Sequence, residues 1–225
     1  MHRARLTGLL LVSIATLAQQ QQSVEITSEP SHHLVMENAY VRVFDVTVAP
    51  KASTLVHRHN KDYLFVTLGD SDVISARPGE KPAALLLKDG EIRYTPGKFA
   101  HAAINQSDKP FRNITIELLK PATNVKTCVK CASAEWKISS DQWTMSVFAI
   151  PQAETVRLEN QGAGTLLVAI SDLEISHLWK VRNWRPRYFK PGNLAWPPAG
   201  ANPVIKNNSS NPAMYAVLEF NPEKQ

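Results

Sequence analysis

Residues 56–63 read Val-His-Arg-His-Asn-Lys-Asp-Tyr, and segments of β character precede and follow them. His57 and His59 are two residues apart, so in a β-strand their side chains leave the same face. Two imidazoles one strand step apart can bind a single divalent ion. We expect the third ligand to be His101, which follows the turn signal Pro96-Gly97. The competing interpretation of the His-Arg-His stretch, taken alone, is a solvent-exposed loop.

The residues around His101 favour metal binding. Four of them have a spacing that resembles the second sequence signature of the cupin superfamily: Gly90, Pro96, His101 and Asn105. The His-Arg-His stretch resembles the first signature. In that family a β-barrel carries a metal ion on both histidines of the first motif, a nearby Glu and the histidine of the second. The resemblance therefore implies that His57, His59 and His101 bind a metal ion.

The match departs from the family pattern at glycines and at the carboxylate. Lys51 stands where cupins have a glycine, and two other glycines are displaced by one residue, to Gly69 and Gly97. Tyr63 stands where the family has its Glu ligand, with Asp62 beside it. The resemblance thus implies a site of three histidines without a carboxylate.

Such a site leaves several metals and roles open. Imidazole ligands suit several divalent ions; we favour Fe(II), with Mn, Ni, Cu and Zn as alternatives. Tyr63 is a candidate catalytic residue, as a weak fourth ligand or a proton donor, and the alternative is a wall residue whose hydroxyl is satisfied locally. Asn105 shares a face with His101 and is a candidate to orient a water or a metal ligand. Arg58 and Asp62 alternate with the residues expected to face the metal, so their side chains are expected at the surface.

Short strand-like segments fill the first half of the chain. The stretch 40–48 alternates apolar and polar residues, and similar short segments follow at regular spacing, separated by turn signals such as Arg77-Pro78-Gly79. No stretch in this half has a sustained period of 3.6 residues. The pattern predicts an all-β sandwich or barrel.

The second half of the chain repeats the first. At a shift of 102 residues, turn and strand positions coincide in pairs, among them Gly90 with Gly192 and Asn105 with Asn207. The architecture resembles the bicupins over about residues 35–221. We therefore predict two tandem cupin barrels of the jelly-roll (double-stranded β-helix) type. Their expected bounds are 35–120 for the N-terminal barrel, 121–140 for a linker and 141–225 for the C-terminal barrel.

The two copies differ at the metal ligands. Upstream of Gly90 the best shift is 101 residues, and there His57 and His59 match Leu158 and Asn160. At the shift of 102 residues, His101 matches Pro203. We expect one metal site, in the N-terminal barrel, and a second barrel that serves as scaffold, lid or dimerisation surface.

The N-terminus predicts export. Basic residues precede an apolar run that ends in small residues, which is typical of a signal peptide over residues 1–18, followed by a polar leader over 19–34. The mature protein is expected to be secreted or periplasmic, without a membrane span. Loss of Arg3 and Arg5 lowers the formal net charge from +5 to +3, which does not argue for nucleic acid binding.

Two further segments attract attention. Cys128 and Cys131 are the only cysteines, and in an oxidising compartment a local disulfide is the expected state. Residues 179–190 interleave basic and aromatic side chains, which suit either anion binding or simple packing of Trp184 and Phe189 against the barrel. We favour the packing interpretation.

The function most consistent with these features is an exported, metal-dependent oxidoreductase of the dioxygenase kind that acts on a small molecule. A second interpretation is a non-catalytic cupin for small-molecule binding or scaffolding. A third is a cupin-type isomerase or lyase, which the lack of a Glu base beside the histidines disfavours. The sequence does not determine the oligomeric state, and a homodimer is one possible assembly.

Overall fold

The computed structural model describes residues 22–131, 134–159, 163–178 and 185–221. These residues contain β-strands and one short 3-10 turn, η1 (Ile26–Ser28), which confirms the all-β prediction. The expected signal peptide lies outside the described residues. Part of the expected polar leader is structured, because it contains strand β1, η1 and the start of β2. No helix among the described residues has the length and hydrophobicity needed to cross a membrane.

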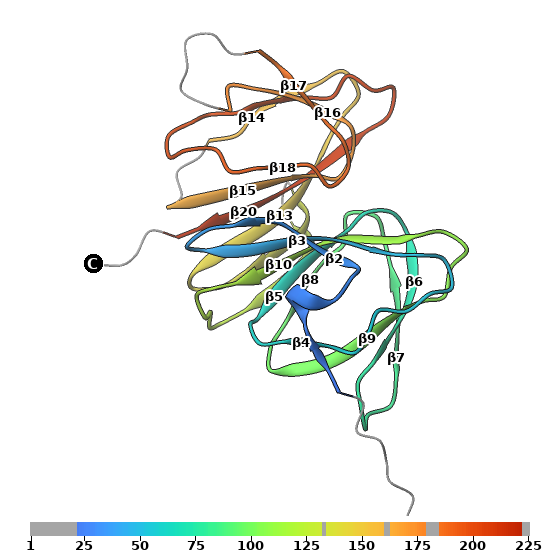
Figure 1. Cartoon of the computed structure of the whole chain (residues 1–225). Helices are drawn as coiled ribbons and strands as arrows, with labels where there is room; N and C mark the ends of the chain where they lie inside the picture. The colour runs from blue at the N-terminus through green and yellow to red at the C-terminus, as the bar shows by residue number, and fades with distance from the viewer. Residues whose placement is uncertain (1–21, 132–133, 160–162, 179–184, 222–225) are drawn as a thin grey trace, which may run out of the picture.

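Two five-stranded sheets form the N-terminal barrel, with strand orders β1-β4-β9-β6-β7 and β2-β3-β10-β5-β8 (Figure 1). The strand bounds are β1 Val24–Glu25, β2 His32–Glu37, β3 Val41–Val48, β4 His57–His59, β5 Tyr63–Thr67, β6 Ser71–Ala76, β7 Ala83–Leu87, β8 Ile92–Thr95, β9 Phe99–Asn105 and β10 Phe111–Leu118. Apolar side chains of both sheets meet inside the barrel, among them Phe44 and Phe65 of one sheet and Val73 and Leu87 of the other.

The C-terminal barrel has a six-stranded sheet, β11-β12-β13-β20-β15-β18, and a four-stranded sheet, β14-β19-β16-β17. The strand bounds are β11 Lys126–Cys131, β12 Ala134–Ser139, β13 Trp143–Ile150, β14 Thr155–Arg157, β15 Gly164–Ala169, β16 Leu173–Ser176, β17 Arg187–Phe189, β18 Leu194–Ala195, β19 Val204–Lys206 and β20 Ala213–Phe220. Its interior core includes Ile175, Phe189 and Tyr215. Phe189 packs inward as predicted, whereas Trp184 lies outside the described residues.

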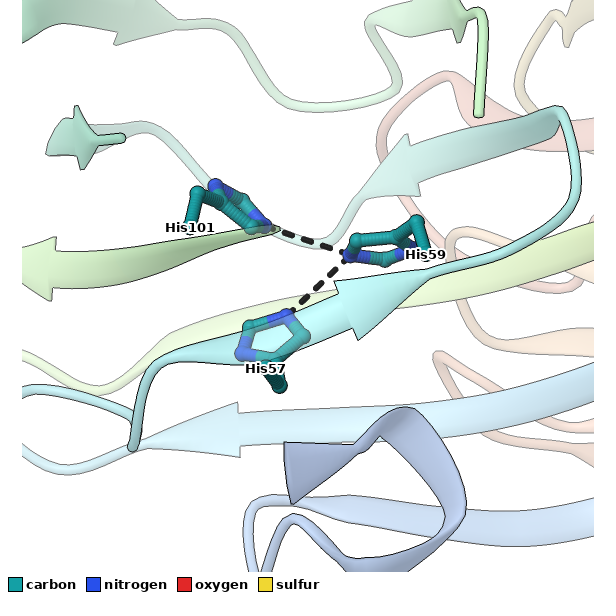
Figure 2. Close-up of side chains that lie close together, drawn as sticks. All are labelled: His57, His59 and His101. Atoms are coloured by element: carbon teal, nitrogen blue, oxygen red, sulfur yellow. Dashed lines mark hydrogen bonds between the residues drawn. The ribbon is translucent and has the colours of Figure 1, made fainter. Parts of the chain in front are cut away.

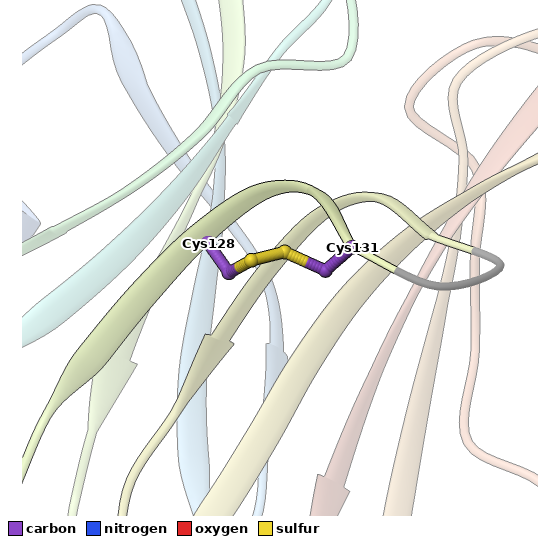
Figure 3. The surroundings of a disulfide bond; sticks show 2 residues. All are labelled: Cys128 and Cys131. Carbon is purple, nitrogen blue, oxygen red and sulfur yellow. A yellow bond between two sulfur atoms is a disulfide. The ribbon is translucent and has the colours of Figure 1, made fainter.

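The segment 121–140, expected as a linker, belongs largely to the C-terminal sheet. Strands β11 and β12 form an antiparallel hairpin, and β12 pairs in turn with β13. Ile138 is buried in the shared core because β12 alternates inward and outward like its neighbours. A disulfide joins Cys128 to Cys131 on the outer strand of this hairpin (Figure 3), with 5.9 Å between their Cα atoms.

The sheet β3-β10-β5 of one barrel stacks on the sheet β13-β20-β15 of the other (Figure 1), and the largest apolar core lies between them. Strand β5 shows the pattern: Leu64 points into the shared core, and Phe65 points into its own barrel. In β15, Leu166 and Leu167 alternate in the same way between the shared core and the C-terminal interior. These strands are apolar on both faces because both faces are covered.

Matching contacts relate the two barrels across this interface. A Cβ at Gly90 would lie 3.6 Å from Cδ1 of Ile170, and one at Gly192 would lie 3.2 Å from Cδ1 of Leu68. Gly192 is the counterpart of Gly90 at a shift of 102 residues, and Ile170 is the counterpart of Leu68 at the same shift. The two contacts are therefore equivalent, as the two halves of a two-fold symmetric dimer interface are. Both glycines have positive φ, 72° and 91°, a backbone conformation that favours glycine.

Candidate metal centre

The three predicted ligands come from two neighbouring strands. His57 and His59 lie on β4, and His101 lies on β9, directly across from His57 in the antiparallel pair. His57 and His59 are buried, at 1% and 2% exposure, and His101 is partly buried. All three rings point toward one another (Figure 2). The structure therefore brings together the three histidines that the sequence predicted, and the loop interpretation is wrong.

Their Nε2 atoms converge at a spacing that suits one ion. Nε2 of His59 lies 3.1 Å from Nε2 of His57 and 3.2 Å from Nε2 of His101. Two nitrogens bound at about 2.1 Å to one ion lie about 3.0 Å apart at a right angle and about 3.4 Å apart at a tetrahedral angle. One donor nitrogen from each ring lies within 4.8 Å of the other two, and no other such group of ligands occurs among the described residues.

The hydrogen bonds made by the Nδ1 atoms bear on which ring nitrogens have a lone pair free for a metal ion. Nδ1 of His57 lies 3.0 Å from the carbonyl oxygen of Leu55, which can only accept, so Nδ1 carries the proton and Nε2 a lone pair. Nδ1 of His101 lies 2.9 Å from Oγ of Ser75. Nδ1 of His59 is buried without a partner among the described residues. Neutral rings packed Nε2 to Nε2 fit a cation at their centre, and the residues present thus fit a divalent metal ion.

The surroundings keep the rings unprotonated. Burial, with added repulsion from His32, lowers the pKa of His57 to about 4. Burial and the neighbouring His57 lower the pKa of His101 to about 3. Burial, followed by repulsion from His101 and His57, lowers the pKa of His59 to about 2. All three rings are neutral at pH 7, which is the form that binds metal.

Tyr63 forms a wall of the site. Its ring stacks on the His59 ring with 4.1 Å between centroids, and its hydroxyl interacts with the side chain of Thr95. Burial raises the pKa of Tyr63 to about 12, so the hydroxyl stays protonated at neutral pH. The contact with Thr95 corresponds to the alternative of a hydroxyl satisfied locally.

Asp62 and Gly97 fix the turn that holds the site together. Asp62 was expected at the surface, but its carboxylate accepts hydrogen bonds from the hydroxyl of Tyr94 at 2.7 Å and from the backbone N–H of Gly97 at 2.9 Å. A Cβ at Gly97 would collide with the backbone of Lys61. The displaced glycine of the family pattern thus lets the turn before β9 approach the connection between β4 and β5. Arg58 is exposed as predicted.

Asn105 serves the fold rather than the histidines. Its amide nitrogen donates to the carbonyl oxygens of Val48, Ala49 and Lys109, and its oxygen accepts from Ser107. Asn207 makes the corresponding bonds in the C-terminal barrel, to Ile150, Pro151, Asn211 and Ser209. The motif recurs in the copy that has no histidine cluster in its described residues, so it is a turn device and not a support for a metal ligand.

Three supporting residues had escaped the sequence analysis: Glu29, His32 and Ser75. The ring of His32 lies 4.5 Å from that of His57, and its Nδ1 lies 2.6 Å from a carboxylate oxygen of Glu29. The other oxygen of Glu29 accepts the N–H of Leu55, whose carbonyl orients His57. Pairing of β1 with β4 and of β2 with β3 places this leader segment behind the site, and no local pattern signals it.

The histidines line a cavity of about 360 Å³ inside the N-terminal barrel. Much of its lining is apolar, including Val46, Phe65, Val73, Leu87 and Phe111. Polar or charged groups also line it, among them Asn113, Thr115, Arg77, Lys81 and Arg93. The volume and the mixed lining suit a small organic molecule.

The C-terminal barrel lacks these ligands at the equivalent positions. The N–H of Leu158 donates to the carbonyl oxygen of Pro203 at 2.8 Å, so the fold brings together the counterparts of His57 and His101. Neither side chain can bind a metal ion. The counterpart of His59, Asn160, lies outside the described residues.

No model of a known protein family matches the sequence, and no curated protein is significantly similar to it. Solved structures share its fold. AerE from Microcystis aeruginosa aligns over 86% of this chain and 99% of its own, with a TM-score of 0.57 and 13% identity. Oxalate decarboxylase from Lactobacillus farciminis, in complex with formate, aligns over 85% of this chain and 84% of its own, with a TM-score of 0.55 and 9% identity.

A cupin 2 conserved barrel domain protein from Leptotrichia buccalis aligns over 84% of this chain and 88% of its own, with a TM-score of 0.51 and 8% identity. At these identities the likeness concerns the fold. The chain has the cupin fold in two copies, as predicted from its repeat and its two histidine motifs.

Proposed function

We propose that the protein is a metal-dependent oxidoreductase of the dioxygenase kind that acts on a small organic molecule. The observation that carries the proposal is the convergence of three neutral imidazoles, without a carboxylate, on the wall of a cavity of about 360 Å³. In a dioxygenase reaction both atoms of O₂ enter the organic product, and the substrate itself supplies the electrons, so no external reductant is required.

His57, His59 and His101 would hold the ion. A bound ion would supply open coordination positions for substrate and dioxygen. We favour Fe(II) because imidazole suits it and because the reaction needs a redox-active ion. Mn(II) is the main competitor, since a structurally similar oxalate decarboxylase from Bacillus subtilis has Mn(II) centres. The chain's own residues contribute orientation: Leu55 and Ser75 fix two of the rings, and Tyr63 covers the third.

The competing interpretations make different use of the same cavity. A binding or scaffolding protein would need the cavity but no turnover. An isomerase or lyase would need a base, and the leader provides a buried carboxylate, Glu29, next to His32. Its oxygens already accept bonds from His32, Ser31 and Leu55, so it acts as a support and does not supply the missing base.

We also propose that the mature protein works outside the cytoplasm. The apolar N-terminal run and the disulfide between Cys128 and Cys131 both suit an oxidising compartment. The surface of the C-terminal barrel is the natural place for a homodimer contact, since the metal site belongs to the other barrel.

Oxygen consumption tests the proposed activity. Protein purified without a histidine tag is expected to bind about one Fe(II) per chain and to consume O₂ with at least one member of a panel of thiols, diketones and flavonols. The control is the His57→Ala, His59→Ala double variant, which should show neither metal nor uptake. Stoichiometric metal without uptake on any substrate would favour the binding interpretation.

Replacement of Tyr63 by Phe separates the ring from the hydroxyl. The ring keeps its contact with His59, so metal content should not change. Because the hydroxyl interacts with Thr95, its loss is expected to cost about one hydrogen bond, or less than about tenfold in oxygen uptake. A fall of about a hundredfold at unchanged metal content would instead identify the hydroxyl as a proton donor in the reaction.

A further inference from the structure

One wall of the cavity carries a cation close to the metal ligands. Arg77 follows directly after β6, two residues beyond Ser75, which orients His101. In an extended strand, residues two apart share a face, so both side chains belong to the cavity side. Both residues line the cavity.

The guanidinium group of Arg77 lies on the ring of Phe99, 3.9 Å from its centroid. The ring of Phe99 in turn lies 5.4 Å from that of His59 and 5.3 Å from that of His101, measured between centroids. The face of Phe99 thus holds the guanidinium in place beside two of the three metal ligands. The positive charge is felt at the site: burial chiefly lowers the pKa of His101, and Arg77 lowers it further.

Arg77 is weakly compensated compared with Arg93, another arginine that lines the cavity. Arg93 is held by Glu91, with 2.6 Å between Nε and the carboxylate. The ion pair of Arg77 with Glu80 is long, at 3.9 Å, and both side chains are partly exposed. Such an exposed pair contributes little, and the planar fork of Arg77 remains suited to bind an anion with two parallel hydrogen bonds.

We propose that Arg77 binds the carboxylate of the substrate, and that the substrate is a monocarboxylate with an apolar body. This inference rests on the proposed function, because it places the reacting part of the molecule at the three histidines. The apolar lining formed by Val46, Phe65 and Val73 would accommodate the body. A single guanidinium fork stacked on an aromatic ring suits one planar carboxylate group, which it can bind through two parallel hydrogen bonds.

Calorimetry with phenylacetate and its neutral isostere phenylacetamide tests this role. Zinc-loaded protein, which has no redox activity, is expected to bind phenylacetate more tightly than the amide. Arg77→Gln should weaken phenylacetate binding by about ten- to a hundredfold, the range for a hydrogen bond to a charged group, and leave phenylacetamide unchanged. Arg77→Lys should give an intermediate loss, because it keeps the charge but not the fork.

The matched control is Arg58→Gln, which removes an exposed arginine on the outer face of β4 and should leave both affinities unchanged. Wild-type affinity for phenylacetate in Arg77→Gln, or no measurable phenylacetate binding to the wild type, would overturn the assignment. The same titrations on metal-free protein distinguish the two proposals. Failure to bind zinc refutes the metal centre, while the effect of Arg77→Gln on phenylacetate binding still decides the role of Arg77.

Discussion

Alanine in place of His59 is expected to abolish stoichiometric metal binding. Nε2 of His59 is the middle atom of the cluster, 3.1 Å from that of His57 and 3.2 Å from that of His101, so its removal leaves two ligands without their common neighbour. Loss of a partner that merely orients a ligand costs about 10- to 100-fold in affinity, and loss of the ligand itself should cost more than about a hundredfold. Metal analysis after dialysis of tag-free protein measures the effect.

Two further variants make this result specific. His33 is an exposed histidine on β2, and His33→Ala should retain the full metal content. Ser75→Ala removes the partner of His101 and should weaken binding by about 10- to 100-fold. A His59→Ala protein that keeps one tightly bound ion would place the metal elsewhere and end the case for this centre.

The sequence predicted the features that depend on local pattern. Strand alternation and turn residues identified the two barrels, and the two-residue spacing of His57 and His59 gave their common face. The shift of 102 residues proved accurate in atomic detail, since Asn105 and Asn207 make corresponding hydrogen bonds. Assigning Asn105 to the metal site failed because a shared face of a strand does not tell which neighbour a side chain meets.

Features that depend on pairing between distant segments were predicted only where the cupin resemblance supplied them, as it did for His101 beside His57. Glu29 and His32 lie in a stretch expected to be a leader, and they reach the site because β1 and β2 pair with β4 and β3. The expected linker joins the C-terminal sheet because β12 finds β13 as a partner. The alternation of apolar and polar residues over 134–139 is a local sign of strand β12, but no local pattern tells which strand it pairs with.

The shared core between the barrels also bears on stability. Strands such as β10 bury residues on both faces, and Ile116 lies in the core between the two barrels without solvent exposure. The ring of Tyr40 in the N-terminal barrel packs against that of Phe220 in the other, with 4.9 Å between ring centroids and an angle of 44° between the ring planes. A core that belongs equally to both barrels predicts that they unfold together.

Truncation of Ile116 to alanine is therefore expected to destabilise both barrels, by about 2–5 kcal/mol in free energy of unfolding. The chain offers a selective probe, because all five tryptophans lie at or beyond position 136, after the last strand of the barrel that contains Ile116. Denaturant unfolding followed by tryptophan fluorescence should show the full loss in the barrel that does not carry the mutation. Circular dichroism should report the same midpoint.

Leu86→Ala is the matched control, since that side chain in the N-terminal barrel is 73% exposed and its truncation should change the free energy of unfolding by less than about 0.5 kcal/mol. If Ile116→Ala left the fluorescence transition unchanged while the circular dichroism transition split in two, the barrels would be independent folding units. Coincident shifts would show that the barrel without metal ligands contributes to the stability of the barrel that carries the histidines. The stabilities of the two barrels are expected to be coupled because the C-terminal barrel covers one face of strands β3, β10 and β5.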